Sequence, residues 1–238
     1  MKIISTITKR ELSAFFTSPI AYVYLLAFLV VTNWLFFRGF FLVGQADLRP
    51  LFGIMPWIFL FFVPAVAMGK WAEERRLGTH EILFTLPVST THIALAKFFS
   101  GLLLIALAVL LTLPMAISAA LLGPLDWGQV IGSYMGTLFM GGAYLAMGLF
   151  VSSCTENQIV AFIVGVLLCF FFFVLGTPLT TWSHGSLWVS LLEYLGMATH
   201  FEAIARGVID SRDIIYYLSL ISFFLFVNVK VLEGRART

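Results

Sequence analysis

The sequence predicts an all-α integral membrane protein with six transmembrane helices. Of its 238 residues, 61% are hydrophobic and 11% are charged, whereas about a quarter of the residues of a typical soluble domain are charged. The mean hydropathy is +1.01. Six hydrophobic runs are long enough to cross about 30 Å of hydrocarbon as helices. The expected spans cover residues 20–37, 51–68, 98–122, 130–151, 159–177 and 214–231, within a single domain of residues 1–238.

The positions of the basic residues predict the orientation of these spans. In a six-span arrangement, ten of the 14 Lys and Arg residues fall on the side of the two termini. The other four are Arg38, Arg49, Arg206 and Arg212. Because short cytoplasmic loops carry an excess of basic residues, both termini are expected in the cytoplasm. We expect no cleaved signal peptide, since the amino terminus lacks its pattern.

The segment before the first span is expected to form a helix in the cytoplasmic interface, over residues 1–18. Polar residues share one face of this helix, although Arg10 and Glu11 disturb the amphipathic pattern. Ser18 and Pro19 are a typical helix start for the first span. Proline inside the second and third spans, at Pro56, Pro64 and Pro114, predicts bends.

The fourth span has a small-residue face. Gly132 and Gly136 are four residues apart, and this spacing lets two helix backbones approach closely in a membrane. The sequence predicts tight packing here, within one chain or across a dimer.

The segment between the fifth and last spans predicts two short external or re-entrant helices. Residues 187–195 are apolar but too few to span, and residues 199–209 are mildly amphipathic. Asp210 and its neighbours then offer capping groups for the last helix.

The predicted spans contain almost no residues suited to ion coupling, nucleotide binding or catalysis. No Asp, Glu, Lys, Arg or His occurs inside the six predicted spans before Lys230, and proton-coupled or ion-coupled transporters usually keep one there. Gly69-Lys70, the single Gly-Lys pair, has Pro64 where a phosphate-binding loop needs glycine. The four histidines are expected to be solvated, and no metal ligand set or catalytic group is predicted. Any energy source must therefore lie in another chain, and we expect no enzyme and no cofactor in this one.

The charged segment between the second and third spans is the strongest functional signal. Glu73, Glu74, Arg75, Arg76 and Glu81 have helical spacing, followed by an apolar stripe and Pro87. These features favour a short docking helix. A solvated loop that only follows the positive-inside rule is an equal alternative from composition alone.

Several short motifs along almost the whole chain resemble those of the permease subunit of type-2 ABC exporters, and within them the gliding-motility-associated permease group. They are Arg10-Glu11-Leu12, Ser18-Pro19-Ile20-Ala21-Tyr22, Gln45-Ala46-Asp47-Leu48-Arg49-Pro50, Met55-Pro56-Trp57, Trp71-Ala72-Glu73-Glu74-Arg75 with Gly78-Thr79 and Glu81, Thr155-Glu156-Asn157-Gln158, and His200-Phe201 through Arg206-Gly207 to Tyr216-Tyr217.

The resemblance implies a bacterial inner-membrane subunit that forms a homodimer or pseudo-dimer and pairs with separate cytoplasmic ATPases, which bind the ATP and Mg²⁺. The coupling helix of such permeases maps to residues 73–89, with expected ATPase contacts at Glu73, Glu74, Arg75, Arg76, Thr79, Glu81, Leu83 and Pro87. A second cytoplasmic loop nearby contains Ser153, Glu156, Asn157 and Gln158. Relatives often work with an external auxiliary protein; no nucleic-acid partner is expected.

Three other functions compete with export. An unenergised channel or secondary carrier would need polar groups that the spans lack. A membrane anchor that transmits force from an ATPase to an external partner, without moving a solute, remains open. An intramembrane enzyme is the weakest alternative, since no catalytic constellation stands out.

Overall fold

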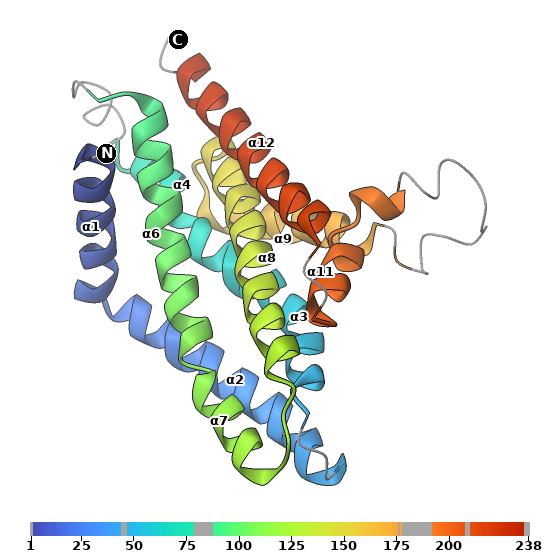
Figure 1. Cartoon of the computed structure of the whole chain (residues 1–238). Coiled ribbons are helices and arrows are strands. Elements are labelled where there is room, and N and C mark those ends of the chain that lie inside the picture. Colours follow the sequence, from blue (N-terminus) through green and yellow to red (C-terminus); the bar gives the residue numbers. More distant parts are fainter. Residues whose placement is uncertain are drawn as a thin grey trace.

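The computed structural model describes residues 2–43, 47–78, 88–175, 177, 192–207 and 210–235, and these residues form helices without any strand. The helices are α1 (Lys2–Thr17), α2 (Pro19–Val43), α3 (Arg49–Ala67), α4 (Gly69–Arg76), α6 (Thr90–Leu110), α7 (Leu113–Leu122), α8 (Trp127–Cys154), α9 (Gln158–Val174), α11 (Met197–Ala205) and α12 (Ser211–Arg235). The start of α1 and the end of α12 lie at one end of the bundle, near α4, while α7 and the end of α2 lie at the other (Figure 1). We call these the terminal end and the opposite end.

Five helical segments are long and apolar enough to cross a membrane in the described part of the chain. They are Pro19–Leu42, Arg49–Arg76, Thr90–Leu122, Trp127–Cys154 and Ser211–Arg235. The predicted fifth span, residues 159–177, corresponds to α9, which is apolar but has 17 residues. Because a spanning helix needs about 20 residues, the six-span count stays a prediction. The chain is a multi-pass, all-helical membrane protein.

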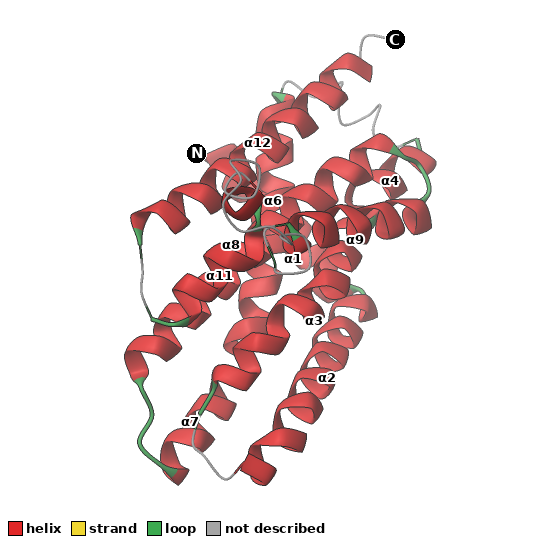
Figure 2. Ribbon diagram, turned by 90° about the vertical axis from the view of Figure 1, so that its right-hand side faces the viewer, coloured by secondary structure: helices red, strands yellow, loops and turns green. Residues whose placement is uncertain are grey.

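Helix α8 is the centre of the bundle, because its glycines let neighbouring helices approach its backbone (Figure 2). A Cβ added at Gly148 would lie 2.6 Å from the Cβ of Ala67 in α3. A Cβ at Gly136 would lie 3.0 Å from Ile204 of α11, and Gly132 is buried in the same helix. The glycine face predicted in the fourth span therefore packs within one chain at Gly136.

The prolines behave differently in the two helices that contain them. Helix α3 continues through Pro56 and Pro64, so the bends predicted there do not interrupt it. The third predicted span is broken at Thr112, between α6 and α7, just before Pro114. The Thr112 hydroxyl donates to the carbonyl of Val109 at 2.7 Å, which satisfies an acceptor at the end of α6.

Helix α1 packs beside the first half of α6 (Figure 1). Thr8 is buried and its hydroxyl donates to the carbonyl of Ala96 at 3.4 Å. The expected amino-terminal helix is therefore present over Lys2–Thr17, and one of its faces is covered by the bundle.

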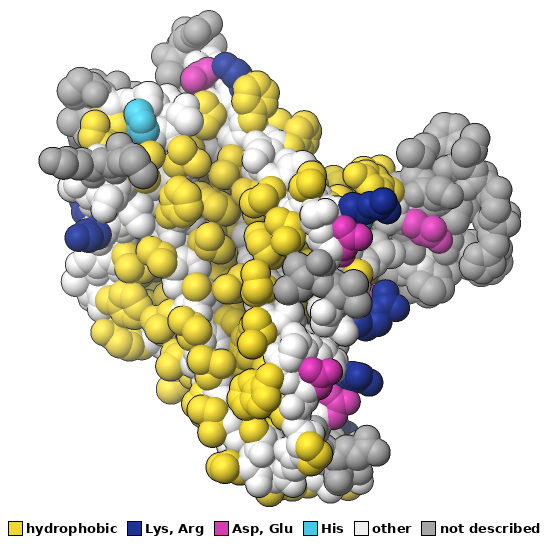
Figure 3. Space-filling model, in the orientation of Figure 1, with side chains coloured by type: hydrophobic (Ala, Val, Ile, Leu, Met, Phe, Trp, Pro, Cys, Tyr) yellow, Lys and Arg dark blue, Asp and Glu magenta, His cyan; other side chains and the backbone are white. Residues whose placement is uncertain are grey.

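The space-filling view shows mostly hydrophobic side chains over the broad face of the bundle, with charged side chains gathered at its edges (Figure 3). Many large apolar side chains are exposed on α2, such as Leu26 at 66%, and on α9, such as Leu167 at 60%. This distribution suits lipid contact, because lipid tails are as apolar as these side chains.

The segment before the last span contains the helix α11 (Met197–Ala205). Its bounds differ from the predicted 199–209 by a few residues, and four residues of the predicted 187–195 helix, 192–195, are helical. The rest of that first predicted helix lies outside the described residues.

The expectation that His200 is solvated was wrong. His200 is 9% exposed, its Nδ1 lies 2.6 Å from Oδ1 of Asp213, and its Nε2 lies 3.0 Å from the carbonyl oxygen of Tyr194. Its ring also stacks on Tyr216, with ring centroids 3.9 Å apart. Burial is tolerated here because both ring nitrogens have a hydrogen-bond partner.

Candidate coupling site at the terminal end

The predicted docking segment begins as an extension of the second span. Helix α4 follows α3 after one turn residue, Met68, and contains Glu73–Arg76 in its last turns. Ser152 of α8 fixes this junction: its hydroxyl donates to the carbonyl of Met68 at 2.7 Å and accepts from the backbone amides of Trp71 and Ala72. The charged residues therefore stand on a short helix that follows α3 directly and that α8 holds in place.

Four ionisable side chains from three helices meet beside this junction, and we call them the ionic cluster: Glu11 of α1, Lys70 and Glu74 of α4, and Lys97 of α6. Lys70 Nζ lies 2.8 Å from Glu11 Oε2, and Lys97 Nζ lies 2.5 Å from Glu74 Oε1. Lys97 Nζ is also 3.6 Å from Glu11 Oε1. Two cations and two anions make the cluster electrically neutral.

The cluster is largely removed from solvent. The Lys97 side chain is 2% exposed and that of Lys70 is 8% exposed. Lys97 also donates to the carbonyl of Lys70 at 3.0 Å, and Lys70 donates to the Ser100 hydroxyl at 3.2 Å. Burying a charge is costly unless partners satisfy it, so these contacts fix the relative positions of α1, α4 and α6.

The electrostatics of Glu11 reflect the same partners. Burial alone raises the pKa of the Glu11 carboxyl, but Lys97 and Lys70 outweigh it, so the pKa lies below its usual value of 4.5. Glu11 is therefore ionised at neutral pH, and α1 is tied to the bundle by charge as well as by packing.

Arg75 joins the same helix to the loop between α8 and α9. Its guanidinium donates to the carbonyl of Ser153 at 3.1 Å and to Oε1 of Glu156 at 3.0 Å. Asn157 in this loop begins α9, because its Oδ1 accepts from the amides of Ile159 and Val160. The second predicted loop therefore lies directly against α4.

The predicted contact residues fall into three groups. Glu74 and Arg75 are bound inside the chain, whereas Glu73 and Arg76 are exposed. Glu73 and Gln158 both lie close to Gly69, since a Cβ there would be 3.5 Å and 3.6 Å from their side chains. The remaining four positions lie outside the described residues: Thr79, Glu81, Leu83 and Pro87.

Sequence reasoning missed three members of the cluster. Lys70 lies just after the predicted span 51–68, and Lys97 lies just before the predicted span 98–122. In the structure, α6 begins earlier, at Thr90, and Lys97 is buried within it. Glu11 was noticed as a break in the amphipathic pattern of the first helix. A charged residue on an otherwise apolar helix face was the available signal for a buried partner.

This architecture is that of a multi-pass membrane protein whose end carries a charged helix bonded to several neighbouring elements. The family described as ABC-2 family transporter protein matches residues 45–199, and the chain belongs to this family. Membership supports a permease subunit of an ABC transporter and implies pairing with an ABC ATPase. A comparison with curated proteins gave no match.

Proposed function

We propose that the chain is the permease subunit of an ABC exporter of the gliding-motility-associated type, present as two copies in a bacterial inner membrane. A separate ATPase in the cytoplasm binds the ATP and Mg²⁺ and docks on residues 73–89. Both termini and the ionic cluster then face the cytoplasm, as the distribution of basic residues predicts.

The bonding of α4 carries this proposal. Glu74 and Arg75 connect α4 to Lys97 of α6 and to the loop that holds Glu156. Lys70 connects it to Glu11 of α1. Because α4 is bonded to helices on both sides, a displacement of α4 moves these helices with it as a rigid body. Such a connection would transmit the nucleotide-driven closure of an ATPase to the bundle.

The exposed side chains of the same helix end supply a surface for the partner. Glu73 and Arg76 are exposed charges, and Leu77 beside them is 62% exposed. An apolar contact bordered by charges is the usual make-up of a protein interface, and the charges would set its orientation and specificity.

The test is a double charge reversal, Glu73→Arg with Arg76→Glu. Neither side chain makes a hydrogen bond or an ion pair with any residue that the structure describes, so we expect the variant to insert and fold normally but to lose ATPase co-purification and stimulation of ATP hydrolysis. The matched control is Glu193→Arg with Arg212→Glu, two exposed residues away from α4, just before α11 and at the start of α12. The proposal fails if the first variant retains both properties.

The force-transmitting anchor remains a second candidate, because α12 is bonded at both ends. Arg235 donates to the carbonyl of Cys154 at 2.9 Å, while Tyr216 and Tyr217 donate to the carbonyls of Leu195 and Met197. A movement of the terminal end could therefore reach the α11 segment without any solute passing. Substrate-dependent ATPase activity in proteoliposomes supports export; activity that no solute changes supports the anchor.

A further inference from the structure

A groove with an aromatic floor lies away from the ionic cluster, between α3, α9 and α11. Its volume is about 710 Å³, within the usual range of about 300–1,000 Å³ for small-molecule sites. The floor includes Phe52, Trp57, Phe173 and Phe201. Trp57 is 49% exposed and packs edge-on against Phe173, with ring centroids 5.2 Å apart. This surface suits the apolar part of a ligand.

Two arginines stand at the rim of this groove. Arg49 is 70% exposed at its side chain, and its Nε donates to Oε1 of Gln129 at 3.1 Å. Arg206 is exposed at the end of α11 and has no ion pair with any residue that the structure describes. The Gln129 contact orients one guanidinium and leaves its two terminal nitrogens able to donate.

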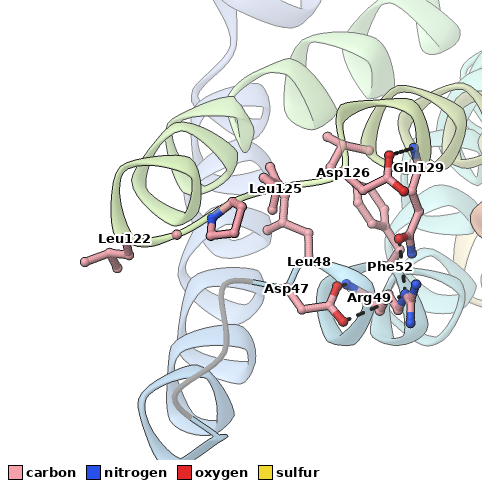
Figure 4. Close-up of a pocket in the computed structure, with 11 residues that line it drawn as sticks. Asp47, Leu48, Arg49, Phe52, Leu122, Leu125, Asp126 and Gln129 are labelled. Atoms are coloured by element: carbon pink, nitrogen blue, oxygen red, sulfur yellow. Dashed lines mark hydrogen bonds and ion pairs between the residues drawn. The ribbon is translucent and has the colours of Figure 1, made fainter.

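Two carboxylates near Arg49, those of Asp47 and Asp126, already accept hydrogen bonds from backbone amides. Figure 4 shows Arg49 between Asp47 and Gln129, in an adjoining cavity of about 450 Å³ that shares Arg49, Phe52 and Gln129 with the groove. Asp47 Oδ1 accepts from the Arg49 amide at 2.9 Å, and its Oδ2 forms an ion pair with Arg49 Nε at 3.8 Å. Asp126 Oδ1 accepts from the amide of Gly128 at 3.0 Å. In the groove itself, Glu202 is one carboxylate against two guanidiniums.

We propose that this groove binds an anionic amphiphile, with its phosphate or carboxylate on Arg49 and Arg206 and its hydrocarbon on the aromatic floor. Guanidinium groups recognise such anions with paired, charge-assisted hydrogen bonds. A cationic amphiphile would be repelled by the two arginines at the rim. A fully apolar ligand would form no hydrogen bond or ion pair with them. The binding stands apart from ATP coupling; that the ligand is the cargo rests on the proposed function.

Gly53 allows the groove to be filled without disturbing the fold. It lines the groove, and a Cβ added there meets no atom within 4 Å. Gly53→Leu places a side chain in this space and also improves helix propensity. Gly39 in α2 is equally open but lies outside the groove, so Gly39→Leu is the matched control.

The experiment measures quenching of Trp57 fluorescence by phosphatidic acid with brominated acyl chains, added to the purified chain in neutral detergent without any ATPase. Trp57→Phe defines the background from the other tryptophans. We expect saturable quenching, a loss of affinity of about tenfold or more for Arg49→Gln with Arg206→Gln, and a similar loss for Gly53→Leu but not for Gly39→Leu. Glu202→Gln should bind a few times more tightly, because it removes the opposing charge.

Equal affinity for brominated phosphatidylcholine would overturn the proposal, and so would an unchanged affinity in Gly53→Leu. The proposal would also be overturned if quenching occurs in the monomer fraction but not in a dimer fraction, because a second copy of the chain would then cover the groove. Because no ATPase is present, these outcomes leave the docking proposal at Glu73 and Arg76 untouched, and failure of docking leaves lipid binding untouched.

Discussion

Replacement of Lys97 by methionine tests whether the ionic cluster holds the terminal end together. The substitution keeps most of the side-chain length and removes the charge from a position that is 2% exposed. It removes the contacts to Glu74 at 2.5 Å and to the carbonyl of Lys70 at 3.0 Å, whereas Glu11 keeps Lys70 at 2.8 Å. Breaking a buried ion pair typically costs about 3–5 kcal/mol. Because Glu74 is still 22% exposed, we expect the lower end, about 3 kcal/mol.

The assay is reversible unfolding in mixed micelles, with the free energy of unfolding compared across a double-mutant cycle. Glu74→Gln alone should destabilise by about 2 kcal/mol, since it leaves Lys97 with its weaker partner Glu11 at 3.6 Å. The double variant should lose about 3 kcal/mol rather than about 5, because residues in one network do not add. A Lys97→Met protein within about 0.5 kcal/mol of the parent, or strictly additive losses, would refute the reasoning.

Three further predictions follow from single contacts. Gly148→Val should destabilise by about 1–3 kcal/mol in the same unfolding assay, since its Cβ would lie 2.6 Å from that of Ala67; an unchanged protein would mean that α3 and α8 can separate freely. Tyr217→Phe should cost about 1 kcal/mol, because its buried hydroxyl donates to the carbonyl of Met197 at 2.9 Å; no loss would contradict that bond. The lowered pKa of Glu11 stabilises the fold above the usual pKa of 4.5, and this contribution is lost as pH falls through the folded pKa. Acid unfolding curves of Glu11→Gln should therefore lack that part of the pH dependence, and superimposable curves would exclude it.

Hydropathy predicted the helices because each long apolar run needs burial in lipid, whatever its neighbours are. Helix α8, for example, spans Trp127–Cys154 around the predicted 130–151. Breaks were harder to predict, since α3 accommodates Pro56 and Pro64 while the chain breaks at Thr112. The difference depends on whether neighbouring groups satisfy the freed backbone positions, and the sequence of a single helix does not contain those neighbours.

The candidate site was predicted only in part, because local sequence patterns do not show which distant residues a side chain contacts. The helical spacing of Glu73–Arg76 is local, so the pattern found it. The partners of these residues are distant in the chain: Lys97 Nζ meets Glu74 after 23 positions, and Arg75 meets Glu156 after 81. Local spacing therefore indicated a charged helix without showing which charges face inward.

Neighbouring arginines at the end of α4 consequently have different roles. Arg75 is 16% exposed at its side chain and bound to the loop that starts α9, so its reversal disturbs the fold before it reaches any partner. Arg76 is exposed, so its reversal should leave the fold intact and affect only the proposed docking of the ATPase. Arg75→Glu combined with Glu156→Arg rebuilds the ion pair in the opposite sense and should restore part of the stability lost in Arg75→Glu; the hydrogen bond from Arg75 to the carbonyl of Ser153 stays lost. If the ATPase docks here as proposed, no compensating change within the chain should restore ATPase binding to Arg76→Glu, because the partner of Arg76 is then on the other protein. This pair of results would separate the transmission of movement from the recognition of the ATPase, the two functions that we propose for this short charged segment.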